Sequence, residues 1–159
     1  MATDDGDDRL DDRVMDTRQY RQTWRLRFEY DGERLRLVRR TRVAMIAPTS
    51  PVQRPRLGES GGMWVELLGD DDRPLFHRVL SDPLRTRVEV HSPDRRPEVR
   101  FGDPQPGQFE VLVPDVPGAR DIAVRGTPLD PVQARETEGR SVEIARFPLT
   151  EPDEPKGAT

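Results

Sequence analysis

Apolar and polar side chains alternate most regularly near the start of the chain. Over residues 23–30, Trp24, Leu26, Phe28 and Tyr30 occupy every second position, and mainly charged residues stand between them. Because successive side chains of a strand point to opposite faces, this period of two predicts a β-strand with one buried face.

The dipeptide Asp31-Gly32 follows this strand directly. An Asp-Gly pair tolerates the positive φ angles of a two-residue hairpin turn, so it predicts that the chain reverses here. We expect the returning strand over residues 33–47, with Leu35 and Leu37 on its inner face. Further along this strand the apolar contacts come from Val43 and Met45 or, with a change of parity, from Ala44 and Ile46, and a bulge or bend over residues 38–41 would reconcile them with Leu35 and Leu37.

The rest of the chain continues as short apolar segments separated by turns. The 16 prolines and 12 glycines fall mostly between these segments, and no stretch of ten or more residues carries a capped helical stripe. This spacing predicts an all-β fold, a single antiparallel β-sandwich of about seven to nine strands. The further strands are expected over residues 63–68, 74–80, 86–91, 98–101, 109–113, 121–125 and 142–147.

The two ends of the chain differ from this pattern. Residues 1–18 are acidic and poor in apolar side chains. Residues 150–159 form a short polar segment that is rich in proline. Segments with so little apolar surface cannot offset the entropy that is lost on ordering. We therefore expect two disordered tails and one folded domain over residues 19–149.

Three short motifs resemble the immunoglobulin-like and fibronectin type III-like sandwiches that occur as accessory modules in bacterial proteins. They are Gly-Met-Trp-Val-Glu-Leu at 62–67, Pro-Leu-Phe at 74–76 and Phe-Glu-Val-Leu-Val-Pro at 109–114. The resemblance implies an immunoglobulin-like or related Greek-key sandwich over residues 20–147, without the disulfide of antibody domains because the chain has no cysteine. It implies no functional site, since this architecture serves many unrelated functions.

The distribution of charge argues against nucleic acid as a partner. The chain carries a net charge of −4, but seven aspartates against two arginines give −5 to residues 1–16 and leave +1 for residues 17–159. Acidic residues stand between the arginines throughout the folded part. Nucleic-acid binders usually show a clear excess of positive charge on one surface.

The sequence also gives no indication of export or membrane insertion. The first ten residues carry four aspartates where a signal peptide needs a positive start and then an apolar run. No stretch approaches the roughly 18 apolar residues of a membrane-spanning helix. With no cysteine available for a disulfide framework, we expect a soluble protein of the reducing cytoplasm.

Motifs for catalysis or metal binding are missing. His77 and His91 are the only imidazoles, no nucleophile motif frames the serines near them, and we expect both to be exposed or at a strand edge. The glycine-rich run at 58–62 lacks the lysine and helix of a phosphate loop. The Asp70–Asp72 cluster lacks the spacing of a calcium loop and is typical of a solvated turn, although calcium stays open. The sequence therefore predicts no catalytic residue, no cofactor and no metal site.

One candidate interaction surface lies on the first hairpin. On both strands, arginines alternate with the apolar residues that are expected to be buried. Four arginine side chains should therefore point to the same outer face. Like charges on neighbouring strands repel, so these side chains need acidic groups of the same chain or an anionic ligand. We expect Glu29, Glu33 and the acidic N-terminal tail to supply the acidic groups, with the tail as a weak, salt-sensitive cover. The four residues are Arg25, Arg27, Arg34 and Arg36.

A second candidate is Trp64 with the loop that precedes it. Trp64 alternates with Glu66 and is expected to be partly exposed, so it is the aromatic residue most suited to contact a ligand. Residues 48–62 are rich in Pro, Ser and Gly without a regular period, and a loop of this length is often a binding loop.

These observations together predict a noncatalytic protein-interaction or structural module, such as an accessory subunit of a bacterial assembly, with a protein as its partner. The alternative is a small-ligand or carbohydrate-binding sandwich that uses Trp64 and the loop at 48–62. An enzyme with a site of an unfamiliar kind is the third interpretation.

Overall fold

The structure of this 159-residue chain is a computed structural model, and it describes residues 16–50, 53–85, 87–90, 93–94 and 98–150. Within these ranges, no helix is long and apolar enough to span a membrane.

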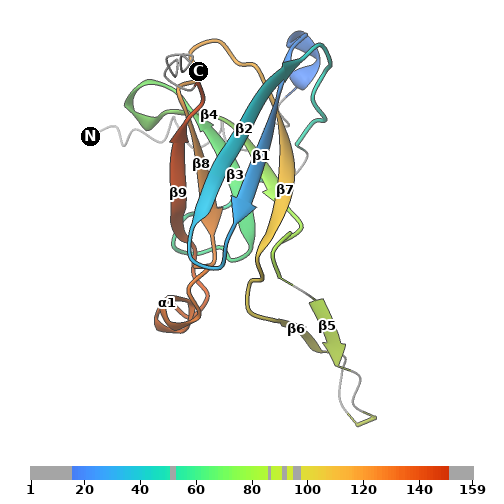
Figure 1. Cartoon of the computed structure of the whole chain (residues 1–159), viewed down its shortest axis with the longest axis vertical. Helices are drawn as coiled ribbons and strands as arrows, with labels where there is room; N and C mark the ends of the chain where they lie inside the picture. The colour runs from blue at the N-terminus through green and yellow to red at the C-terminus, as the bar shows by residue number, and fades with distance from the viewer. Residues whose placement is uncertain (1–15, 51–52, 86, 91–92, 95–97, 151–159) are drawn as a thin grey trace, which may run out of the picture.

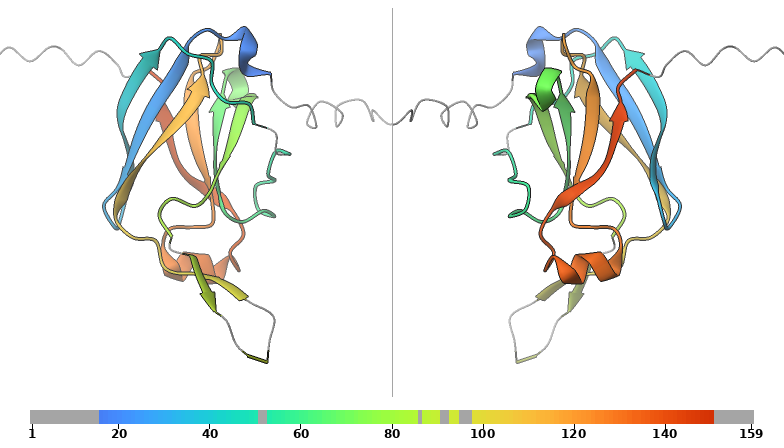
Figure 2. Two further views of the ribbon diagram at one scale, coloured as in Figure 1. Left: turned by 90° about the vertical axis from the view of Figure 1, so that its right-hand side faces the viewer. Right: turned by 90° about the vertical axis from the view of Figure 1, so that its left-hand side faces the viewer.

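Seven strands form two antiparallel sheets that face one another, which confirms the predicted sandwich (Figures 1 and 2). The three-stranded sheet has the order β2-β1-β7, and the four-stranded sheet has the order β4-β3-β8-β9. The first sheet comprises β1 (Thr23–Tyr30), β2 (Leu35–Val43) and β7 (Gly107–Pro114). The second comprises β3 (Met63–Leu68), β4 (Pro74–Leu80), β8 (Asp121–Gly126) and β9 (Val142–Pro148).

The core lies between the two sheets and is built from alternate positions of their strands. All four apolar side chains of β1 are buried, as the alternation predicted, and Leu26 and Phe28 are completely enclosed. Phe28 stacks on Phe109 of the neighbouring strand and contacts Phe147 of the opposite sheet. Burial of this apolar area is the main stabilising contribution to the fold.

The strand order of the three-stranded sheet differs from the immunoglobulin order that the resemblance implied. In immunoglobulin domains the second strand lies between the first and the fifth. Here the first strand, β1, lies between β2 and β7, the second and fifth strands of the sandwich.

The turn between β1 and β2 is longer than predicted. Four residues, 31–34, connect the strands, and Tyr30 pairs with Leu35. The two-residue turn was wrong because Asp31 closes a wider turn with its side chain, which accepts hydrogen bonds from the backbone amides of Glu33 and Arg34 at 2.8 Å. These hydrogen bonds hold the pKa of the Asp31 carboxyl below its usual value.

The predicted bulge in the second strand is confirmed. Arg27 pairs with Arg39 and Phe28 pairs with Leu37, so Val38 is the extra residue between them. The bulge keeps Leu37 on the inner face and turns Arg39 outward, onto the same face as Arg27.

The segments predicted as strands at 86–91 and 98–101 lie outside the sandwich. They form β5 (Arg87–Val90) and β6 (Glu98–Phe101), a separate two-stranded antiparallel hairpin that projects from one end of the body (Figure 1). Their place in a sandwich sheet was therefore wrong, although the strands themselves are present.

Short helices complete the domain. Helix α1 (Pro131–Glu136) has six residues, which agrees with the prediction that no stretch of ten or more forms a helix, and it is capped by the side chain of Asp130. The 3-10 helix η1 (Thr17–Gln19) begins inside the predicted tail. Thr17 is buried and donates a hydrogen bond from its hydroxyl to the carbonyl of Ala47, so this part of the predicted tail packs on the domain. Residues 1–15 and 151–159 of the predicted tails lie outside the described residues.

Candidate functional site

Between Arg25 and Glu29, the outer face of the three-stranded sheet carries three rows of side chains that run across β2, β1 and β7. We call it the arginine face, because four arginines stand on it against two glutamates. Each row contains one side chain from each strand, since directly paired residues of an antiparallel sheet point to the same side. The rows are Thr41-Arg25-Leu112, Arg39-Arg27-Glu110 and Arg36-Glu29-Gln108.

Only part of this positive charge is balanced on the face itself. Arg27 donates two hydrogen bonds to one carboxylate oxygen of Glu110, from Nε at 3.1 Å and from Nη2 at 2.8 Å. Arg36 forms a looser ion pair with Glu29 at 3.5 Å. The hydrogen bond from Arg27, with the nearby charges of Arg27, Arg25 and Arg39, lowers the pKa of Glu110 against a weaker opposing effect of desolvation.

Arg25 and Arg39 form no ion pair with any residue that the structure describes. Arg39 lies directly opposite Arg27 on the neighbouring strand, an arrangement of like charges that is unfavourable without a counterion. Between these side chains lies a recess of about 100 Å³, lined by Arg25, Arg27, Arg39, Thr41 and Glu110. The arrangement is suited to bind an anionic group.

The structure places three of the four predicted arginines on this face, namely Arg25, Arg27 and Arg36. Arg34 is exposed but lies in the turn, because the turn extends to residue 34. Arg39 was missed, since simple alternation places it on the inner face with Leu37. The change of parity that predicted the bulge was the signal that could have found it.

The acidic partners agree only in part with the prediction. Glu29 pairs with Arg36 as expected, whereas Glu33 forms no ion pair with a described residue. Glu110 was missed because it lies 83 residues from Arg27 along the chain, and nothing local in the sequence shows that β7 pairs with β1.

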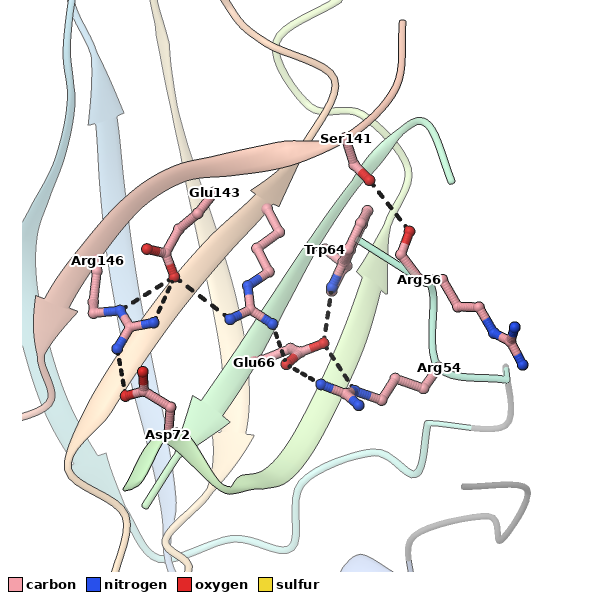
Figure 3. A network of polar contacts seen from close by, with 9 residues as sticks. Arg54, Arg56, Trp64, Glu66, Asp72, Ser141, Glu143 and Arg146 are labelled. Carbon is pink, nitrogen blue, oxygen red and sulfur yellow. Dashed lines mark hydrogen bonds and ion pairs between the residues drawn. The ribbon is translucent and has the colours of Figure 1, made fainter. Parts of the chain in front are cut away.

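A second polar cluster is buried on the outer side of the four-stranded sheet (Figure 3). Its centre is the carboxylate of Glu66 on β3, which is fully buried. Trp64 donates to it from the indole nitrogen at 3.1 Å, and Arg54 donates two hydrogen bonds, each at 3.1 Å. Arg125 of β8 donates a fourth hydrogen bond at 2.8 Å. The carboxylate is thus satisfied from three sides.

The cluster continues across the sheet from Arg125 (Figure 3). Arg125 approaches Glu143 of β9 at 3.5 Å, and Glu143 accepts hydrogen bonds from Arg146, which also donates to Asp72 at 2.6 Å. The hydrogen bonds to Glu143 and then to Asp72 raise the pKa of Arg146 above its usual value. This chain of charges fastens β3, β8, β9 and the turn after β3 to one another.

The expectation that Trp64 is partly exposed was wrong, since only 1% of it is accessible. Residues 53–62 run along the outer side of the four-stranded sheet (Figure 2). They are held by Arg54 and by backbone hydrogen bonds that join Gly58 and Ser60 to Ser141, at 3.1 and 3.0 Å. A ligand would reach Trp64 only after this segment moves.

The described residues among the other candidates for catalysis or metal binding are buried or engaged in ion pairs. His77 lies on the edge strand β4, as expected, but is buried and not exposed, opposite Glu66. His91 lies outside the described residues. Asp70 and Asp72 form ion pairs with Arg120 and Arg146, and no group of three metal-ligating side chains occurs among the residues described.

One cavity of about 370 Å³ lies at the end of the four-stranded sheet where β4 and β8 end and β3 and β9 begin. Its wall includes a buried ion pair between Asp82 and Arg85 at 2.7 Å, and Arg85 also donates to the carbonyl of Pro128. The volume lies within the range of small-molecule sites. The lining residues are Gly61, Gly62, Leu80, Asp82, Arg85, Thr127 and Gly139.

Comparisons with known proteins identify no relative. The chain matches no protein-family model, no curated protein and no solved structure.

Proposed function

We propose that this protein is a noncatalytic interaction module, an accessory subunit of a larger assembly, that binds an acidic segment of a protein partner through its arginine face. The observation that carries this proposal is the pair Arg25 and Arg39, which have no acidic partner among the residues that the structure describes. Arginine suits this role because its planar guanidinium donates paired hydrogen bonds to a carboxylate.

The sheet that carries the arginine face is held firmly by the core behind it, which favours a role in binding. The face is centred on β1, whose opposite side is locked into the core by Leu26 and Phe28. Side chains on a central strand are held in fixed relative positions, so less order is lost when a partner binds.

The buried cluster supports a role without catalysis. Glu66 and His77 have the chemistry of a general acid or base, but their exposed fractions are 0% and 7%. Glu66 is already fully hydrogen-bonded by Trp64, Arg54 and Arg125, an arrangement that is typical of a structural ion pair.

The test is the binding of a fluorescent ten-residue glutamate peptide to the full chain, measured by anisotropy over a range of salt concentrations. We expect the double charge reversal R25E/R39E to weaken binding by at least tenfold and to reduce its salt dependence. The matched control R73E/R135E changes the same charge at exposed positions away from the face, and we expect less than a threefold effect. Equal losses in the two double variants would show that net charge alone attracts the peptide and would contradict the proposal.

A second candidate function, small-ligand binding, is favoured by the cavity of about 370 Å³ and not by Trp64. Filling this cavity with L80F should abolish the thermal stabilisation by any small molecule that binds there, whereas R25E should leave it unchanged. A ligand whose stabilising effect survives L80F would contradict this second proposal.

A further inference from the structure

The recess in the middle of the arginine face is small and is lined mainly by charged residues. Its volume is about 100 Å³, which leaves room for a small anionic group. Three guanidinium groups and one carboxylate line it, with Thr41 as a further polar group.

The three arginines of the recess are not equivalent. Arg27 is engaged by Glu110 through two hydrogen bonds, whereas Arg25 and Arg39 have no acidic partner among the described residues. An entering anion would therefore be bound by Arg25 and Arg39 together, while Arg27 stays on Glu110. It would also relieve the repulsion between Arg39 and Arg27 on neighbouring strands.

The bulge at Val38 orients Arg39 toward the outer face of the sheet. Without the extra residue, alternation would place Arg39 on the inner face, and the recess would lose one of its two available guanidinium groups. The bulge leaves Val38, an apolar side chain, 42% exposed. Bulges that redirect a side chain are common next to functional sites.

The two guanidinium groups without an acidic partner among the described residues indicate the chemistry of the ligand. Arginine donates paired hydrogen bonds to a carboxylate, so Arg25 and Arg39 are suited to hold one such group. Building on the proposed function, we propose that the recess receives one carboxylate side chain of the partner's acidic segment and thereby sets the register of that segment on the sheet.

Single substitutions that remove equal charge separate this proposal from general attraction. With the glutamate peptide and the full chain, we expect R25Q and R39Q each to weaken binding about tenfold, and R36Q, which lies on the same face outside the recess, less than threefold. Because both arginines bind the same carboxylate, the double variant R25Q/R39Q should lose clearly less than the product of the two single losses. All of these side chains point outward, so melting temperatures should stay within a few degrees of the original protein.

The outcomes distinguish the two proposals. Equal losses in R25Q, R39Q and R36Q that multiply in combination would overturn the recess and leave the arginine face as a general docking surface. No loss in any of them would overturn the proposed function as well.

The identity of the anion is tested by competition at constant ionic strength. We expect acetate to displace the peptide, and E110Q to strengthen peptide binding because it frees Arg27. Failure of acetate to displace the peptide under conditions in which inorganic phosphate displaces it completely would overturn the assignment to a carboxylate.

Discussion

At the scale of single residues, the most constrained side chain is Glu66. Its carboxylate is removed from water on β3 and is compensated by Arg54, Arg125 and the indole of Trp64. A buried charge is tolerated only when it is paired and hydrogen-bonded, so the removal of one member leaves the others uncompensated. Surface ion pairs, such as Arg36 with Glu29, lack this dependence because water replaces the lost partner.

We predict that E66Q lowers the free energy of unfolding by about 3 kcal/mol or more, because the amide fills the same space but removes the buried negative charge that Arg54 and Arg125 share. The matched control E29Q removes the same charge from an exposed pair and should cost less than about 1 kcal/mol. Urea denaturation of both variants checks this, and a loss in E66Q no larger than that in E29Q would refute a structural role for the cluster.

At the scale of elements, the hairpin of β5 and β6 differs from every other pair of strands. Each sandwich strand is covered on its inner face by the opposite sheet, whereas β5 and β6 pair mainly with one another and project from the body (Figure 1). A two-stranded hairpin alone is only marginally stable in water. The hairpin therefore adds little to the stability of the sandwich.

We predict that replacing residues 87–101 with a short Gly-Ser linker changes the melting temperature by less than about 3 °C. The linker must be long enough to keep the backbone hydrogen bond from Gln105 to the carbonyl of Leu84. Shortening the segment at 53–62 by a similar strategy is the control, since that segment covers Trp64 and its loss should destabilise the domain clearly. A large loss after removal of the hairpin would show that it packs on the body.

At the scale of the whole molecule, arginines also join the two sheets at both open edges of the sandwich. Arg40 of β2 donates to the carbonyl of Pro148 on β9 at 3.0 Å. At the other edge, Arg78 of β4 donates to the carbonyl of Leu112 on β7 at 2.7 Å. Desolvation lowers the pKa of Arg78, which reflects how deeply this side chain enters the edge. Hydrogen bonds from arginine side chains therefore hold the two sheets together at both edges of the sandwich.

We predict that a chain restricted to residues 16–150 keeps the melting temperature of the full chain within about 5 °C, since the removed ends are poor in apolar side chains. A chain that starts at Tyr20 should be less stable, because it also loses the hydrogen bond from Thr17 to Ala47. Calorimetry distinguishes these cases, and a large loss in the 16–150 chain would show that an end packs on the sandwich.

The same truncation tests whether the acidic N-terminus covers the arginine face. Residues 1–15 carry six aspartates and two arginines, so they would compete with an acidic peptide at low salt. We expect the 16–150 chain to bind the glutamate peptide more tightly than the full chain does, with a difference that disappears at high salt. Equal affinity at low salt would refute the cover.

The sequence by itself determined the local features of this protein. Alternation and turn residues predicted strands close to all nine that the described residues form, the bulge near Val38 and three arginines of the face. These features depend on neighbouring residues, because strand period, turn conformation and parity are properties of short segments.

Only the tertiary structure decided which segments meet. It placed Glu110 beside Arg27, laid residues 53–62 over Trp64, and left β5 and β6 outside the sandwich. An alternating strand shows which side chains share a face, but not whether a distant segment covers that face or which strand pairs at its edge. Those choices depend on long-range packing, in which the apolar area and the charges of the whole chain are satisfied together.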